Sequence, residues 1–199
     1  MGEVRQETDG GTATVVLGAA SGPIEAEDQL ICACKSGDQV AYHRLFDLYR
    51  DRVFTLAAYH LNGDAAAAED VVQTVFVKLF RTIGQFRKES DFSTWLYRSV
   101  ANACMDEHRR RKKWLPWASV PEPAYSLDLD GVSETVRAAV EKLSPKLRMP
   151  ILLKYFEGMS YEEIAITLGC SMGTVASRLN RAHKMLSQHL RHLREDSDA

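Results

Sequence analysis

Residues 65–83 read AAAAEDVVQTVFVKLFRTI, and the spacing of the apolar residues in this stretch decides the class of the fold. They recur at intervals of one, three and four, the period of a helix that buries one face. The residues of this stripe are Val71, Val72, Val75, Phe76, Leu79, Phe80 and Ile83. Just before the stretch, Asn62-Gly63-Asp64 supplies residues that tolerate the left-handed backbone at a helix end. The sequence therefore predicts a helix over 65–83, preceded by the end of another.

The same pattern continues on both sides of this helix. Upstream, residues 39–60 carry a matching stripe of Leu45, Phe46, Leu48, Tyr49, Val53, Leu56 and Ala57. Downstream, residues 92–111 carry Trp95, Leu96, Val100 and Met105. No segment shows the alternation of a half-buried strand. Residues 25–113 are therefore predicted to form one helical domain.

A second helical segment follows after residue 131. Ser144-Pro145 predicts a helix start with a capping side chain, and Pro150 predicts that this helix is bent or starts late. Ser160 followed by Glu163 is a capping box, and Gly169 predicts the end of that short helix. Ser171 then begins a last helix with a basic exposed face. This order of elements indicates a helix-turn-helix.

Composition divides the rest of the chain. Residues 1–24 are rich in Gly, Ala and Thr and are expected to be a disordered acidic leader. Residues 114–131 hold three prolines and no base, which favours a flexible linker. The second domain is placed at 132–194, with a tail at 195–199. The predicted fold is all-α, with two helical domains joined by a flexible linker.

Charge is segregated although the formal net charge is only −2. Residues 1–28 hold six acids and one base, residues 98–113 hold six bases and two acids, and residues 171–194 hold five bases and no acid. Two basic segments on a nearly neutral chain indicate two contacts with a polyanion. Charge alone leaves open that they are solvated helix ends.

Several classes of function are disfavoured. No run reaches the roughly 18 apolar residues of a membrane helix, so a cytoplasmic protein without membrane insertion is expected. Four scattered cysteines (Cys32, Cys34, Cys104 and Cys170) lack a second pair for a metal site. No nucleotide-binding loop, zinc-protease motif or nucleophile elbow is present. We therefore expect no enzymatic activity, no cofactor and no metal, and the six histidines are expected mostly on exposed helix faces.

Two segments suit nucleic acid. On the last helix, Ser, Thr and Arg side chains fall away from the apolar stripe, where they could contact the major groove, although helix-turn-helix geometry also occurs without DNA. Residues 87–98 (RKESDFSTWLYR) interleave aromatic and basic residues, a mixture that suits unpaired bases. Trp95 and Leu96 could equally be core residues.

Two sets of motifs then resemble a known family. Ala68-Glu69-Asp70-Val71-Val72-Gln73 with Phe76, and Phe92-Ser93-Thr94-Trp95-Leu96-Tyr97-Arg98 with Asn102 and the basic run after it, resemble region 2 of the sigma-70 family. Leu143-Ser144-Pro145, residues 155–165 (YFEGMSYEEIA), Gly173-Thr174-Val175 and Ser177-Arg178-Leu179 look like region 4. With only these regions, over about residues 29–190, the chain is most similar to the extracytoplasmic-function (ECF) group.

The resemblance implies a transcription initiation factor with three binding surfaces. Docking on the β′ clamp helices of core RNA polymerase is implied for Asp70, Gln73 and Phe76. Recognition and opening of the −10 promoter element, with a flipped base near residues 90–93, is implied for Arg87, Ser90, Phe92, Ser93, Trp95, Tyr97, Arg98, Asn102, Arg109, Arg110 and Arg111. Reading of the −35 element is implied for Ser171, Thr174, Ser177, Arg178, Arg181 and Lys184. Contact with the polymerase β subunit, a linker toward the polymerase interior and an anti-sigma partner are also implied.

Two positions depart from the family pattern. Thr74 stands where members commonly have an acid, which puts one polymerase contact in doubt. Ala176 stands where they commonly have Lys, which removes one expected contact at the −35 element. The alternative function is a helix-turn-helix regulator without sigma activity, which would fit residues 157–184 equally well but gives no reason for the first domain.

Overall fold

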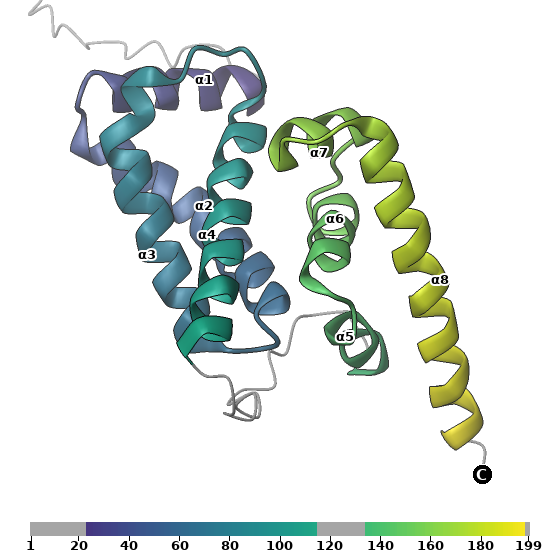
Figure 1. Ribbon diagram of the computed structural model, residues 1–199. Helices are drawn as coiled ribbons and strands as arrows, with labels where there is room; N and C mark the ends of the chain where they lie inside the picture. Colours follow the sequence, from purple (N-terminus) through teal and green to yellow (C-terminus); the bar gives the residue numbers. More distant parts are fainter. Residues whose placement is uncertain (1–22, 115–133, 198–199) are drawn as a thin grey trace, which may run out of the picture.

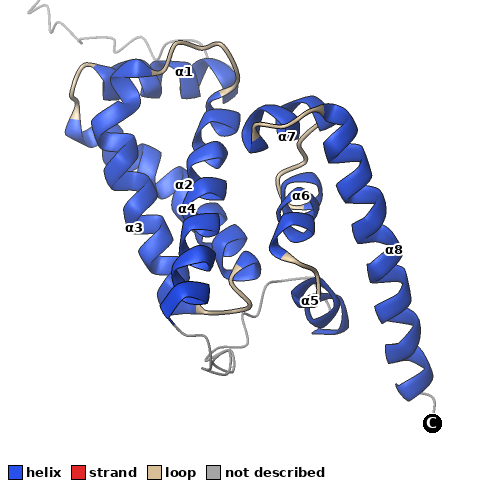
Figure 2. Cartoon of the chain, viewed as in Figure 1, coloured by secondary structure: helices blue, strands red, loops and turns tan. Residues whose placement is uncertain are grey.

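The structure, a computed structural model, describes residues 23–114 and 134–197, and within these ranges it consists of helices joined by short loops, with no strand (Figure 2). The first bundle (Figure 1) consists of α1 (Pro23–Lys35), α2 (Gln39–His60), α3 (Ala65–Thr82), the 3₁₀ turn η1 (Ile83–Gln85) and α4 (Phe92–Trp114). The second consists of α5 (Glu134–Glu141), α6 (Pro145–Tyr155), α7 (Tyr161–Leu168) and α8 (Met172–Ser197). The all-α prediction is confirmed.

The first bundle follows the predicted stripes except at two positions, Leu48 of α2, which is 53% exposed, and Phe80 of α3. Two aspartates fix the helix starts. Asp38 accepts hydrogen bonds from the backbone N–H groups of Val40 and Ala41, and Asp64 accepts one from Ala67 at 2.9 Å. Side-chain caps of this kind satisfy N–H groups that have no partner inside the helix. Asn62 adopts φ 60°, the left-handed conformation expected between α2 and α3.

One member of the α3 stripe was predicted wrongly. The other residues of the stripe, from Val71 to Ile83, are buried, but Phe80 is 60% exposed. Its ring packs edge-on against Tyr42 of α2 at a centroid distance of 4.7 Å. The apolar stripe is wider than the face that α2 and α4 cover, and the side chain at its margin remains open to solvent.

The second bundle has the predicted helix starts and ends, with one difference at Ser144. Ser160 and Glu163 form both halves of the capping box, and Gly169 ends α7 with φ 59°. Ser144 takes the N-cap position of α6, but its side chain makes no capping hydrogen bond. The helix does not start late: it begins at Pro145 and contains the buried Pro150.

Some boundaries also differ from the prediction. The helix predicted to end at Arg111 runs to Trp114, α1 already includes Pro23 and Ile24, and α8 continues through most of the predicted tail, to Ser197. The remainder of the predicted leader (1–22) and linker (115–131) lies outside the described residues.

The two bundles pack against each other, α4 against α7 and α2 against α5 and α6. Arg148 of α6 is only 3% exposed, and its guanidinium donates to the backbone oxygen of His60 at 2.6 Å and to the side-chain oxygen of Asn62, both in the first bundle. It also donates to the backbone oxygens of Val140 and Leu143 near the end of α5. One buried arginine thus closes a helix end of its own bundle and joins it to the other.

Two further contacts lie at the same interface. The Arg52 guanidinium is 2.6 Å from the carboxylate of Glu157, whose side chain is 4% exposed. The rings of Tyr59 and Phe156 pack at a centroid distance of 4.7 Å. A tethered pair of domains was predicted without any such interface.

Candidate nucleic-acid and protein interfaces

An apolar groove of about 750 Å³ runs between α2 and α3. Its lining includes side chains at helical spacing on both helices: Gln39, Tyr42, His43 and Phe46 from α2, and Gln73, Phe76, Val77, Phe80 and Arg81 from α3. Val77 and Phe80 are 52% and 60% exposed. Two neighbouring helices thus leave an apolar face without a covering element among the described residues, as interaction surfaces commonly do.

The three residues predicted for polymerase docking lie in different settings. Gln73 is exposed and lines the groove. Phe76 lies deeper, 7% exposed, with its ring edge-on to Phe46 at 4.7 Å. Asp70 is exposed one turn earlier on α3, beside the α3–α4 surface rather than in the groove.

The segment predicted to read the −10 element surrounds an aromatic cluster. Phe86 and Phe92, at the two ends of the connection between η1 and α4, lie 5.5 Å apart by ring centroids, and Trp95 packs on both at 5.6 and 5.9 Å. Phe86 and Phe92 are each 4% exposed. The connection 87–91 is therefore a short polar loop whose two ends are fixed in the core.

Burial separates the predicted −10 residues between 87 and 102 into three groups. Phe92 (4% exposed) and Tyr97 (fully buried) are core residues, so in this arrangement neither offers a ring face to DNA. Burial and the nearby carboxylate of Glu157 raise the pKa of Tyr97, which keeps its hydroxyl neutral. Exposed residues of the set are Arg87, Arg98 and Asn102, while Ser90, Ser93 and Trp95 are half-buried.

The three arginines at the end of α4 are not equivalent. Arg111 is half-buried and is 2.7 Å from Asp64, the capping residue of α3, and 2.8 Å from Glu107. Arg110 forks onto Glu107, and Arg109 contacts Asp106 at 2.8 Å. Arg111 thus ties α4 to the start of α3, whereas Arg109 and Arg110 stay exposed and can exchange an acidic partner for a phosphate.

The predicted −35 residues share the first turns of α8. The Ser171 hydroxyl accepts a hydrogen bond from the backbone N–H of Thr174 at 3.2 Å, which caps the helix start. Ser177, Arg181 and Lys184 are exposed. Arg178 is half-buried, with its guanidinium 3.9 Å from the sulfur of Cys170.

The opposite face of α8 holds the helix in place. Val175, Leu179 and Ala182 are at most 1% exposed and face the core of the second bundle. The Tyr155 hydroxyl is 2.9 Å from the ring of His183. Buried and exposed faces of α8 are thus separated along its whole first half, as a helix that enters a DNA groove requires.

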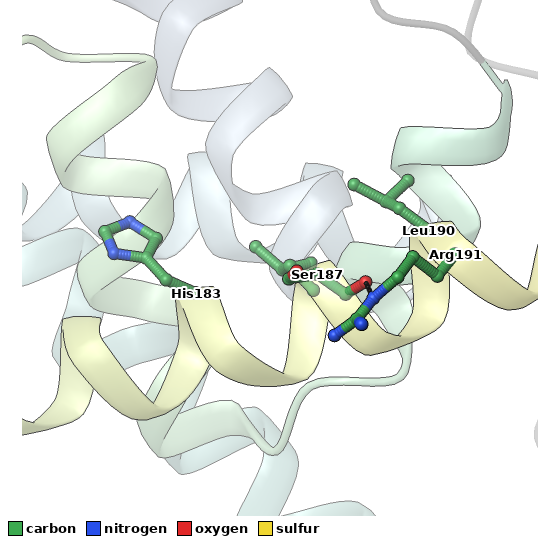
Figure 3. Close-up of a pocket in the computed structure, with 5 residues that line it drawn as sticks. His183, Ser187, Leu190 and Arg191 are labelled. Carbon is green, nitrogen blue, oxygen red and sulfur yellow. Dashed lines mark hydrogen bonds between the residues drawn. The ribbon is translucent and has the colours of Figure 1, made fainter.

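The far half of α8 carries a shallow groove of about 390 Å³ along one side (Figure 3). It is lined by His183, Leu186, Ser187, Leu190 and Arg191. Figure 3 shows Arg191 turned back along its own helix, where its Nε donates to the backbone oxygen of Ser187 at 3.3 Å. Among the residues that the structure describes, no group of three or more His, Cys, Asp or Glu is placed to hold a metal ion.

Sequence reasoning missed part of these surfaces. The α2 side of the groove was not predicted, although Gln39, Tyr42, His43 and Phe46 follow helical spacing and could have been recognised as a second face of that helix. Contacts from α1 to the loop 87–91 were not foreseen either: Lys35 donates to the backbone oxygen of Phe86, and Asp28 pairs with Lys88. Local sequence patterns do not predict contacts between residues more than fifty positions apart.

Comparison with known proteins gives two family matches in the order of the two bundles. Residues 45–114 match the family model for sigma-70 region 2, and residues 133–186 match the model for sigma-70 region 4. None of the described helices combines the length and apolar character needed to cross a membrane.

Several relatives match along nearly their whole length. The RNA polymerase sigma-H factor of Pseudomonas aeruginosa is 31% identical over 85% of this chain and 96% of its own. The ECF RNA polymerase sigma factor SigW of Bacillus subtilis is 34% identical over 80% and 94%. The sigma factor RpoE of Bartonella quintana, solved with the anti-sigma factor NepR, superposes with a TM-score of 0.61 at 27% identity, covering 75% of this chain and 96% of that one. The chain therefore belongs to the ECF group of the sigma-70 family of RNA polymerase sigma factors, transcription initiation factors that are not enzymes.

Proposed function

We propose that this sigma factor docks on core RNA polymerase through the α2–α3 groove and the adjacent face of α3, opens the −10 element with the loop 87–91 and α4, and reads the −35 element with the first turns of α8. The observation that supports this proposal most directly is the apolar groove between α2 and α3. A DNA-binding regulator needs only the second bundle, whereas a sigma factor also needs a surface for the polymerase.

Helix-in-groove binding fits the shape of this surface. An apolar floor from Phe46, Phe76, Val77 and Phe80, with polar groups at the rim, suits a partner helix that presents its own apolar side chains. The exposed side chain of Gln73 at its rim, and that of Asp70 on the adjacent face of α3, can fix the register of that partner by hydrogen bonds. We assign the β′ clamp helices to this site.

The proposed promoter contacts are predicted residues whose side chains are exposed or half-buried. Arg87, Arg98 and Asn102 are exposed around the loop and the start of α4, and Arg109 and Arg110 add positive charge further along the same helix. An unstacked base can lie in the loop near Ser90 and Ser93 while these cations hold the backbone. On α8, Thr174, Ser177 and Arg181 would face the major groove, with Lys184 on phosphate.

An anti-sigma factor is the proposed inhibitory partner. A related sigma factor has been solved with such a protein. A partner that covers the α2–α3 groove would exclude the polymerase, since both proteins would need the same exposed Val77 and Phe80 side chains. The expected result is mutually exclusive binding of the two proteins.

In vitro transcription tests the proposed function. The purified chain is mixed with core RNA polymerase and a fragmented genomic library, and strand opening is mapped by permanganate reactivity of unpaired thymines. We expect open complexes at a defined set of sites, each with a common upstream element. DNA binding by the chain without any open complex would favour the regulator without sigma activity.

A further inference from the structure

The loop 87–91, which the proposed function places against an unstacked promoter base, is attached to a helix that has no role in that proposal. Figure 1 shows α1 lying across one end of α2, α3 and α4, and α1 contacts η1 directly. Two side chains of α1 reach the loop. They are Asp28 and Lys35, seven residues apart, which places them on one face of the helix two turns from each other.

Lys35 holds the start of the loop. Its ammonium Nζ donates to the backbone oxygen of Phe86 at 2.7 Å and lies 6.0 Å from the centre of the Phe86 ring. Phe86 is 4% exposed, so this carbonyl lies at the edge of the aromatic cluster. A hydrogen bond from a charged donor is shorter and stronger than one between neutral groups. The contact therefore fixes the backbone at the residue from which the loop leaves the core.

Asp28 acts two residues further on. Its carboxylate is 2.7 Å from the ammonium of Lys88, which has φ 56°, a left-handed conformation that non-glycine residues seldom adopt. The two side chains are 49% and 55% exposed, so the ion pair by itself contributes little. The ion pair instead fixes the position of Lys88, because it holds this strained residue on the side of the loop that faces α1.

The remainder of the loop is left open. Arg87 and Asp91 are exposed and Ser90 is half-buried, while Phe86 and Phe92 anchor the ends. A site that selects one base must hold its groups within a fraction of an ångström, and such positioning comes from neighbouring residues that do not touch the ligand. Here α1 supplies those neighbours.

We propose that Lys35, assisted by Asp28, is a positioning residue for base recognition at the −10 element: α1 holds the loop 87–91 in the shape that selects the base without contacting DNA itself. The inference rests on the proposed function of the loop. It assigns to α1 a part in specificity, separate from polymerase docking and from the −35 element.

The experiment uses the full-length chain with core polymerase and a promoter library randomised over the −10 region. Holoenzyme selects from the library, the open complexes are recovered, and base preference is counted by sequencing. Variants are Lys35→Met, Lys35→Arg and Asp28→Asn. Lys146→Met and Asp47→Asn are matched controls, since both residues are exposed and no ion pair or side-chain hydrogen bond of theirs is seen among the described residues.

We expect Lys35→Met to lower the preference for the favoured base at the position the loop contacts by about tenfold, the size of one charge-assisted hydrogen bond. Lys35→Arg should restore most of it, because a guanidinium can also donate to the Phe86 carbonyl. Asp28→Asn should lower it by about two- to threefold. Core affinity and binding to −35 duplex should not change, and both controls should match the wild type.

Two outcomes would overturn the inference. One is Lys35→Met holoenzyme with an unchanged base preference, whether or not total opening falls, because a general loss of stability reduces opening at all sequences alike. The other is failure of Lys35→Arg to restore preference. Should Lys35→Met not fold, Asp28→Asn decides on the same readout. If wild-type holoenzyme opens no member of the library, the proposed function itself has failed, which these variants do not decide.

Discussion

At the scale of single residues, burial changes the meaning of several side chains that look alike in the sequence. His60 is fully buried at the interface between the bundles, and neither ring nitrogen has a hydrogen-bond partner among the described residues. Burial, with the positive charge of Arg148 nearby, lowers the pKa of His60 to about 3. The sequence had favoured exposed helix faces for most histidines, and His60 departs from that expectation.

This histidine should make the fold sensitive to acid. Unfolded chain binds a proton at His60 below about pH 6.5, whereas the folded state resists protonation down to about pH 3. Stability contributed by the neutral ring is therefore present above pH 6.5 and is lost as the pH falls, by about 2 kcal/mol at pH 5. His60→Leu should remove this loss, as urea unfolding at pH 7 and pH 5 would measure. An equal loss in the variant and the wild type would contradict the assignment to His60.

Arg111 and Arg109 differ in how far their ion pairs are shielded from solvent. Arg111→Ala breaks the contacts to Asp64 and Glu107, which are partly shielded, and should lower the free energy of unfolding by about 1 kcal/mol. Arg109→Ala removes an exposed pair and should leave stability unchanged, but it should reduce the salt dependence of single-stranded DNA binding by roughly one ion. Urea unfolding and binding titrations at several salt concentrations measure both. Equal effects of the two variants in either assay would be inconsistent with the structure.

At the scale of elements, α2 and α3 each carry apolar side chains on two faces. One face of each helix packs into the bundle, and a second leaves the apolar groove uncovered, including the exposed Phe80. On α7 the capping box fixes the start of a helix of only eight residues, and Gly169 in the left-handed conformation ends it before α8. The surface proposed for the polymerase is thus the part of α2 and α3 that their neighbours leave open.

The groove predicts a selective loss of polymerase binding. Phe80→Ser removes an exposed aromatic ring from the groove and should weaken core polymerase affinity by about tenfold or more, with little effect on stability because the ring is 60% exposed. Leu48→Ser is the matched control: Leu48 is 53% exposed on α2 but does not line the groove. Fluorescence anisotropy with core polymerase provides the measurement. Equal loss in both variants would mean that the groove is not the docking site.

At the scale of the whole molecule, the two bundles are held together by a few buried contacts. A compact chain of this length has a diameter of roughly 40 Å, whereas the −10 and −35 elements lie about 25 base pairs, or about 85 Å, apart on B-form DNA. The packed arrangement cannot reach both at once. The proposed function therefore requires the bundles to separate on the polymerase.

Arg52 tests how firmly they are joined. Arg52→Ala leaves the Glu157 carboxylate buried without its ion-pair partner, which should favour opening of the interface. We expect a larger radius of gyration by small-angle X-ray scattering, with helical content unchanged. Arg44→Ala, an exposed position on the same helix, should behave like the wild type. An unchanged radius in Arg52→Ala would show that Arg148 and the ring contact hold the bundles without it.

The sequence by itself determined the helices, the caps at Ser160 and Ser171 and the order of the two regions, because periodicity and capping depend on residues within a few positions of each other. It also placed the residues proposed for the −35 element at the start of α8, since one helix fixes their spacing. Tertiary structure decided what depends on the covering of one helix by another: the burial of Phe92 and Tyr97, the structural part of Arg111, the exposure of Phe80, and the contacts of Lys35 and Arg148. The period of a helix shows which residues share a face, but only packing shows which faces another element covers.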